Sequence, residues 1–65
     1  MIVNLNGEKR DLPVGTTLRG LLAQLNLSPD KVAIELNRRL ARAEKLDNPL
    51  APNDEIEIVT FVGGG

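Results

Sequence analysis

The sequence TTLRGLLAQL, residues 16–25, decides the fold class of this chain. Its four leucines follow the i, i+3, i+4, i+7 spacing that places side chains on one helix face, at Leu18, Leu21, Leu22 and Leu25. We therefore expect a helix whose apolar face packs against a core. Thr16 or Thr17 is expected to cap the first turn, because a threonine hydroxyl accepts a hydrogen bond from a free backbone N–H. Gly20 costs a helix about 1 kcal/mol relative to alanine, a cost that close packing at this position would explain.

The residues before this helix predict a β-hairpin. Residues 2–5, IVNL, are typical of a strand, and the following Asn6 and Gly7 both tolerate the positive φ angles of a two-residue type I′ turn. A return strand is expected over residues 8–12. Its charged side chains favour an outer position in the sheet, because charges at a sheet edge discourage pairing with other chains.

The residues after the helix predict further strands. In residues 32–36, VAIEL, large apolar side chains alternate with small or charged ones, so this strand is expected to bury one face. Its buried residues are expected to be Val32, Ile34 and Leu36. A short strand is expected near Leu40, and a longer one over residues 55–62.

One helix combined with four to five strands predicts an α+β fold, in which the helix covers one face of a mixed sheet. A chain of 65 residues forms one domain and buries roughly 60% of the surface that its unfolded form exposes. We therefore expect a single domain over residues 1–65, with a flexible glycine tail at residues 63–65.

The composition excludes several kinds of active site. The chain has no cysteine and no histidine, and Phe61 is its one aromatic residue. A thiolate nucleophile, a Ser-His-Asp relay and a Cys/His zinc site are therefore excluded, and no metal site is expected. Any chemistry has to come from carboxylates, hydroxyls, lysines or a chain terminus.

The charge and hydropathy of the chain argue against nucleic acids and membranes as partners. Eight basic residues against nine acidic ones give a formal charge of −1, which is no electrostatic footprint for a nucleic acid duplex. The apolar stretches are much shorter than the roughly 20 residues that span a bilayer, and Met1 is followed by a strand-like sequence instead of a signal peptide. We expect a cytoplasmic protein.

The last expected strand carries apolar residues on both faces. If Ile56 and Ile58 face the helix, the alternation of a strand places Val59 and Phe61 on the face that the helix leaves uncovered. Together with Val62 beside the glycine tail, they would form a docking patch for a partner. The alternative is that a twist or bulge tucks Phe61 into an edge of the core.

The three glycines at residues 63–65 have two interpretations. Chain ends are often disordered, so they can be a frayed terminus or a cloning remnant. Alternatively, residues without a Cβ can thread a narrow channel in a partner, at roughly 3.3 to 3.6 Å per residue, and present a carboxylate there.

Half of the basic residues lie close together in the sequence, at Arg38, Arg39, Arg42 and Lys45. They are interpreted either as a solvated face or as contacts to an acidic surface of a partner. Glu55 and Glu57 belong to an alternating strand without pocket-forming sequence around them, so they do not predict acid–base catalysis.

Five segments, in this order along the chain, resemble the ThiS family of small sulfur carriers, which have the β-grasp fold of ubiquitin. They are residues 2–7, 15–18, 32–37, 53–59 and 61–65. The resemblance spans essentially the whole chain and includes the C-terminal glycines.

The resemblance implies that the reactive group is the carboxylate of Gly65. A ThiF-type adenylyltransferase would use MgATP to form a glycyl adenylate, and sulfur that originates from a cysteine desulfurase would convert it to 1-thioglycine, a thiocarboxylate. A ThiG-type thiazole synthase would accept this sulfur for thiamin. The carrier itself would be no enzyme and would bind no cofactor, while Gly63 and Gly64 would thread the partner's channel.

Two alternatives remain open at this point. Within the same chemistry, the chain would be a MoaD-like small subunit of molybdopterin synthase or a carrier for tRNA thiolation. From a different class, it would be a β-grasp interaction module or protein modifier that never carries sulfur. Residues 38–45 depart most from the family, and partner specificity is expected to lie there.

Overall fold

The structure, a computed structural model, describes residues 1–61. Its regular elements are β1 (Ile2–Leu5), β2 (Glu8–Asp11), α1 (Leu18–Gln24), η1 (Pro29–Lys31), β3 (Val32–Leu36), β4 (Arg39–Leu40), η2 (Ala43–Lys45) and β5 (Glu55–Thr60), where η marks a single 3-10 turn.

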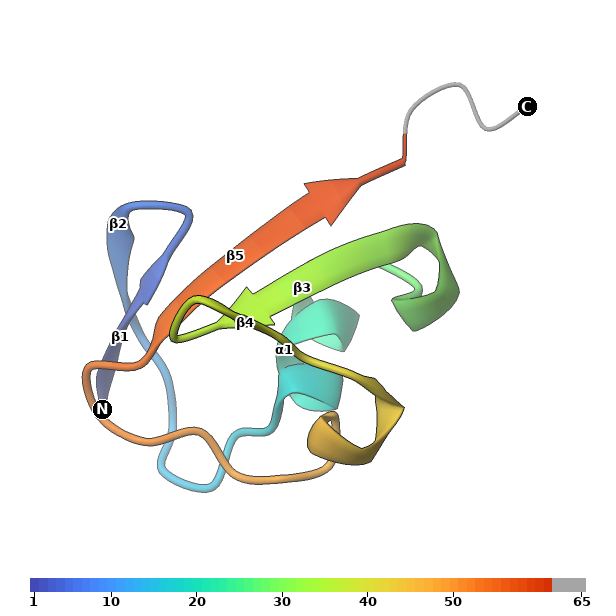
Figure 1. Cartoon of the computed structure of the whole chain (residues 1–65). Coiled ribbons are helices and arrows are strands. Elements are labelled where there is room, and N and C mark those ends of the chain that lie inside the picture. The colour runs from blue at the N-terminus through green and yellow to red at the C-terminus, as the bar shows by residue number, and fades with distance from the viewer. Residues whose placement is uncertain (62–65) are drawn as a thin grey trace.

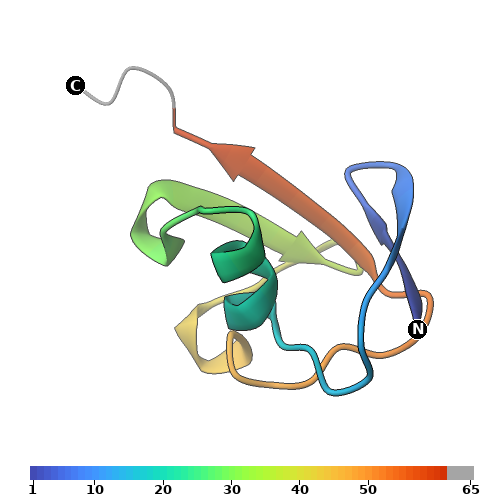
Figure 2. The ribbon, with the colours of Figure 1, turned by 180° about the vertical axis from the view of Figure 1, so that it is seen from behind.

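The strands form one five-stranded sheet in the order β2-β1-β5-β3-β4. β1 and β5 pair in parallel, whereas the other neighbours are antiparallel. α1 lies against one face of this mixed sheet, as the two opposite views show (Figures 1 and 2). The predicted α+β architecture is therefore confirmed, with five strands, and the last strand in the chain is the middle strand of the sheet.

The predicted N-terminal hairpin is confirmed. Asn6 and Gly7 have φ angles of 50° and 83°, and Leu5 lies opposite Glu8, so two residues connect the strands. All four residues of β2 are exposed, and β2 is an outer strand as expected. The return strand ends one residue earlier than expected, because Leu12 turns into the core.

The helix α1 is held by its buried leucines and capped by one threonine. Leu18, Leu21 and Leu22 are buried. Thr17 is the cap, and its Oγ1 accepts a hydrogen bond from the backbone N–H of Gly20 at 3.0 Å. Close packing does not explain Gly20, since an added Cβ would lie 3.5 Å from Thr17 Oγ1, an ordinary contact.

The long connection after β4 completes the core beneath α1. Leu46 and Leu50 are buried there beside the helix and strand residues. Backbone hydrogen bonds attach the connection to the start of the helix, from the N–H of Arg19 to the carbonyl of Leu46 at 3.0 Å and from the N–H of Leu50 to the carbonyl of Thr16 at 2.8 Å. The connection therefore forms part of the core.

β5 is shorter than its predicted range of residues 55–62. It ends at Thr60, and the N–H of the next residue, Phe61, donates to the carbonyl of Lys31 in η1 at 3.1 Å. Val62 lies outside the described residues. None of the helices within residues 1–61 has the length and apolar character needed to cross a membrane.

Candidate functional site

The candidate site is the sheet face that α1 does not cover, which we call the open face. Ile56 and Ile58 of β5 are buried on the helix side, and the alternation of the strand directs Glu57 and Val59 the other way. Val59 and Phe61 are 60% and 61% exposed. Of the two alternatives for Phe61, the structure therefore shows the exposed side chain and excludes burial at the core edge.

The strand register fixes what surrounds these two apolar residues. Ala33 of β3 lies directly opposite Val59, so small and apolar side chains share this end of the open face.

Leu40 lies opposite Glu35 in the β3–β4 pair and is 57% exposed. The sequence predicts a strand near Leu40 but not the exposure of its side chain, because a two-residue strand is too short to show an alternating pattern.

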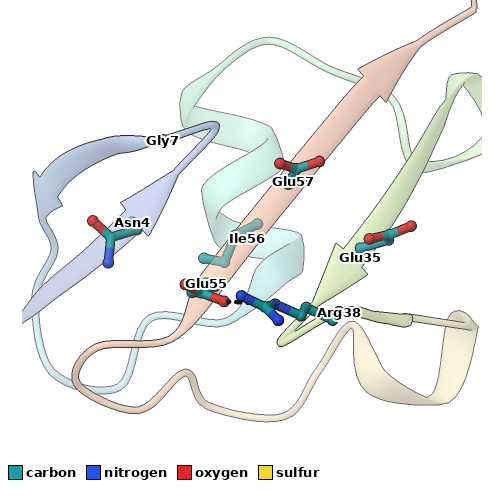
Figure 3. A pocket seen from close by; sticks show the side chains of 7 residues that line it. All are labelled: Asn4, Gly7, Glu35, Arg38, Glu55, Ile56 and Glu57. Carbon is teal, nitrogen blue, oxygen red and sulfur yellow. Dashed lines mark ion pairs between the residues drawn. The ribbon is translucent and has the colours of Figure 1, made fainter.

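The other end of the open face is charged. Glu35 and Glu57 lie opposite each other in the β3–β5 register, and the Nε of Arg38 lies 3.7 Å from an Oε atom of Glu55 (Figure 3). These four charged residues line an open hollow on the face, together with Asn4 of β1. Among residues 1–61, no three His, Cys, Asp or Glu side chains are placed to hold a metal ion.

The structure does not bring the candidate arginines together. Arg38 lies in the turn between β3 and β4 and reaches toward the open face (Figure 3). Arg39 lies opposite Leu36, whose side chain packs on the core side of the sheet. Arg42 lies two residues beyond β4, beside a different hollow. All three are exposed, but they do not form one basic surface.

The side chain of Asn6 is a feature that sequence reasoning missed. Its Oδ1 accepts a hydrogen bond from the N–H of Ile58 at 2.8 Å, and its Nδ2 donates to the carbonyl of Ile58 at 3.3 Å. Asn6 was recognised only as a turn residue, and no sequence signal connects it to a strand more than 50 positions away.

The remaining candidate residues are Val62, Gly63, Gly64 and Gly65, and they lie outside the described residues. What the structure does describe is the strand that leads to them. β5 runs from the charged end of the open face toward its apolar end, and Phe61, directly after β5, is the last residue that the structure describes. The exposed Val59 and Phe61 therefore come shortly before the C-terminal glycines in the sequence.

Comparisons with known proteins found a matching family model, relatives of similar sequence and solved structures of similar fold. A family model described as the ThiS family matches residues 3–65. The chain is 44% identical over 66 residues to a thiazole synthase from Magnetococcus marinus and 34% identical over 62 residues to one from Paramagnetospirillum magneticum. These matches cover 100% and 94% of this chain but only 20% and 19% of those proteins. The chain therefore spans about a fifth of the length of these relatives.

A third relative and two solved structures match over nearly their whole length. The uncharacterized protein ycf40 of Porphyra purpurea is 35% identical over 65 residues, which cover 97% of this chain and 90% of that protein. The crystal structure of a thiamine biosynthesis protein (ThiS) from Geobacter metallireducens has a TM-score of 0.79 and 26% identity, with both chains fully covered. An NMR structure of a thiamine biosynthesis protein from the same organism has a TM-score of 0.76 and 26% identity over 100% of this chain and 88% of that one.

Proposed function

Because this chain belongs to the ThiS family, we propose that it is a sulfur carrier of thiamin biosynthesis and that it carries sulfur on the C-terminal carboxylate of Gly65. The family match carries this proposal, since it runs through residue 65 and so includes the glycines. The ThiS protein of known structure supports it, because it shares the fold over the full length of both chains.

The chemistry starts with a carboxylate, which is a poor electrophile. A ThiF-type adenylyltransferase activates it: a carboxylate oxygen of Gly65 attacks the α-phosphorus of MgATP, and pyrophosphate leaves. A persulfide sulfur, supplied through a cysteine desulfurase, then attacks the acyl carbon and expels AMP. The carrier is then joined to the donor through an acyl disulfide. A second thiolate attacks the sulfur that belongs to the donor, so that a new disulfide forms and the thiocarboxylate leaves. The product is 1-thioglycine at residue 65.

In this scheme the carrier supplies a docking surface and a slim terminus, while the partners supply the catalytic groups. Val59 and Phe61 give the open face an apolar end, and burial of such side chains against a partner is the main favourable contribution at protein interfaces. Gly63 and Gly64 have no Cβ, so their backbone can enter a channel that excludes water from a hydrolysable adenylate.

The sulfur acceptor we propose is a ThiG-type thiazole synthase. A segment similar to this chain makes up about a fifth of two proteins that are themselves named thiazole synthase. A carrier and an acceptor within one polypeptide meet at a high effective concentration, which suits a transfer between them. These relatives therefore support thiazole formation as the pathway of this carrier.

The proposal is tested by the intact mass of the protein after incubation with its ThiF-type enzyme, MgATP and a persulfide donor. We expect one oxygen to be exchanged for sulfur at Gly65, and no exchange without ATP. Deletion of Gly65 should abolish adenylation without changing the circular dichroism spectrum. If the intact chain stays unmodified while a ThiS protein of known activity reacts, or if conjugates to lysine appear instead, the sulfur-carrier function is contradicted.

The docking surface is tested with Phe61→Ala, which removes the largest exposed side chain of the open face. We expect an unchanged unfolding midpoint, because Phe61 is 61% exposed, and a loss of kcat/KM for adenylation of roughly 10-fold or more, as for a buried aromatic anchor. Val14→Ala is the matched control, since Val14 is 86% exposed in the loop between β2 and α1. Equal kinetics of both variants and the unaltered chain would contradict this role of Phe61.

A further inference from the structure

The two edges of β5 are paired to different lengths. Successive residues of a strand direct their backbone N–H and C=O groups to alternate sides. The carbonyl of Glu55 accepts from the N–H of Asn37, just after β3, and the N–H of Phe61 donates to the carbonyl of Lys31, just before β3. The backbone groups of the odd-numbered residues of β5 therefore face β3. The even-numbered residues Ile56, Ile58 and Thr60 therefore face β1. β3 accompanies β5 as far as Thr60, but β1 stops opposite Ile56.

The side chain of Asn6 extends the β1 edge by one more residue. The N–H of Asn6 still donates to the carbonyl of Ile56 at 2.8 Å, and then the chain turns away into the hairpin (Figure 1). At Ile58 the amide of the Asn6 side chain takes the place of a neighbouring strand. It accepts a hydrogen bond from the N–H of Ile58 and donates one to the carbonyl of Ile58. Two residues beyond Ile58, no residue within the described range bonds to the N–H or the carbonyl of Thr60.

This open stretch differs from the outer edges of the sheet. β2 carries Glu8, Lys9, Arg10 and Asp11 along one outer edge, and β4 at the other edge has only two residues. Charges and short strands are the usual protection against unwanted pairing. The β5 edge at Thr60 has neither protection, because its neighbours Val59 and Phe61 are exposed and apolar. Its backbone groups are therefore available for pairing with another strand.

We propose that the protein which processes the C terminus binds this carrier by adding an extended segment to the β5 edge at Thr60. The N–H and carbonyl of Thr60 would bond to the backbone of that segment, in the place that β1 leaves free beyond the Asn6 side chain. This inference rests on the proposed function, since it assumes a partner at the C terminus. The occupant is a strand of that partner because the exposed Val59 and Phe61 flank the same edge and give its side chains an apolar surface.

Pairing at Thr60 would also orient the residues that follow. A strand added here would place the Thr60 backbone between β3 on one side and the partner on the other, directly before the residues that lead to the C terminus. Main-chain hydrogen bonds supply affinity in such strand additions, and side chains supply specificity. The edge therefore couples recognition of the folded body to alignment of the terminus.

Amide hydrogen exchange measured by NMR tests the proposal directly. In the free carrier, the Thr60 amide should exchange rapidly, whereas the Ile58 amide, bonded to Asn6, should be protected. In the complex with the ThiF-type enzyme, we expect at least about a tenfold rise in protection at Thr60 and little change at Ile58. An unprotected Thr60 in a complex that still forms the thiocarboxylate overturns the inference and leaves the proposed function intact. Concentration-dependent protection without a partner also overturns it, because a second copy would then be the occupant.

Removal of the donor provides the second test. Thr60→Pro removes the N–H that faces the open edge, and proline is tolerated at such positions. We expect a folded protein and a loss of kcat/KM for adenylation of roughly 2- to 12-fold, the value of one hydrogen bond. Thr60→Val, which keeps the N–H, should react like the unaltered chain. Should the proline disturb the fold, an amide-to-ester replacement at the Thr60 nitrogen, introduced by protein ligation, removes the same donor. Unchanged kinetics of the folded ester variant would overturn the inference.

Discussion

Arg38 occupies a backbone conformation that the described chain otherwise gives to asparagine or glycine. Its φ angle is 69°, and the other residues with positive φ among residues 1–61 are asparagines or glycines. The two hairpin turns make a matched pair, since Asn6 is followed by Gly7 and Asn37 by Arg38. Only glycine adopts this conformation without a steric cost. The ion pair of Arg38 with Glu55 offsets little of that cost, because the Arg38 side chain is 88% exposed.

We therefore expect Arg38→Gly to raise the free energy of unfolding by about 0.5–1 kcal/mol. The change relieves the left-handed strain, and the greater freedom of glycine in the unfolded chain offsets part of this gain. Urea unfolding measures this gain. The converse change, Gly7→Arg, should destabilise the protein, since the Gly7 φ angle is 83°. If Arg38→Gly proves less stable than the unaltered chain, the turn does not store strain at this residue.

α1 is a helix of seven residues, and its stability depends on its neighbours. Isolated helices of this length do not persist in water. The buried leucines attach it to the sheet, and the Thr17 cap satisfies one of the N–H groups that its first turn leaves free. Gly20, at the end of that first turn, contributes no packing, since its Cβ position lies near only the threonine side chains.

Gly20→Ala is expected to raise the free energy of unfolding by about 0.5–1 kcal/mol, because alanine loses less backbone freedom on folding and its Cβ meets Thr17 Oγ1 at 3.5 Å. Thermal and urea unfolding check the gain. Thr17→Ala serves as the opposing control, and loss of the cap should cost about 1 kcal/mol. A lower stability of Gly20→Ala would show that the added methyl group disturbs the cap.

At the scale of the whole molecule, the helix and the long connection after β4 are joined by an ion pair. The Nε of Arg19 donates to an oxygen of Asp47 at 2.7 Å. This hydrogen bond is the main reason that the pKa of the Asp47 carboxyl is lowered and the pKa of Arg19 is raised. A lowered carboxyl pKa contributes stability above the pKa of the unfolded chain, and this contribution is lost as the pH falls through the folded-state value. Arg19 stays protonated over this range.

Asp47→Asn should therefore lower the urea midpoint at pH 7 slightly, and the difference from the unaltered chain should fade as the pH falls below about 4. Glu44→Gln is the control, because Glu44 makes no ion pair within residues 1–61. Urea titrations at several pH values test this expectation. A difference that persists unchanged at pH 2 would show that charge on Asp47 is not its cause.

Local sequence patterns predicted most of this fold because the elements follow local rules. The leucine spacing of α1, the Asn6-Gly7 turn and the alternation in β3 each act over a few residues, and the structure confirms them. The exposure of Phe61 remained open, because alternation gives the face of a strand but does not show what covers it. The Asn6 bonds to Ile58 were missed for a similar reason: they join residues that only the tertiary fold brings together.

The strand order has a consequence for synthesis of the chain. Of the five strands of this sheet, β5 is the last to leave the ribosome, yet it separates the β2–β1 pair from the β3–β4 pair in the finished sheet. Until residues 55–60 are available, the two hairpins have no common neighbour, and the long-range pairings that unite them form late. A chain terminated before β5 therefore cannot complete the sheet and is left to proteases. Cells containing this protein would hold a folded body only in molecules whose translation has already reached the segment leading to the C-terminal glycines.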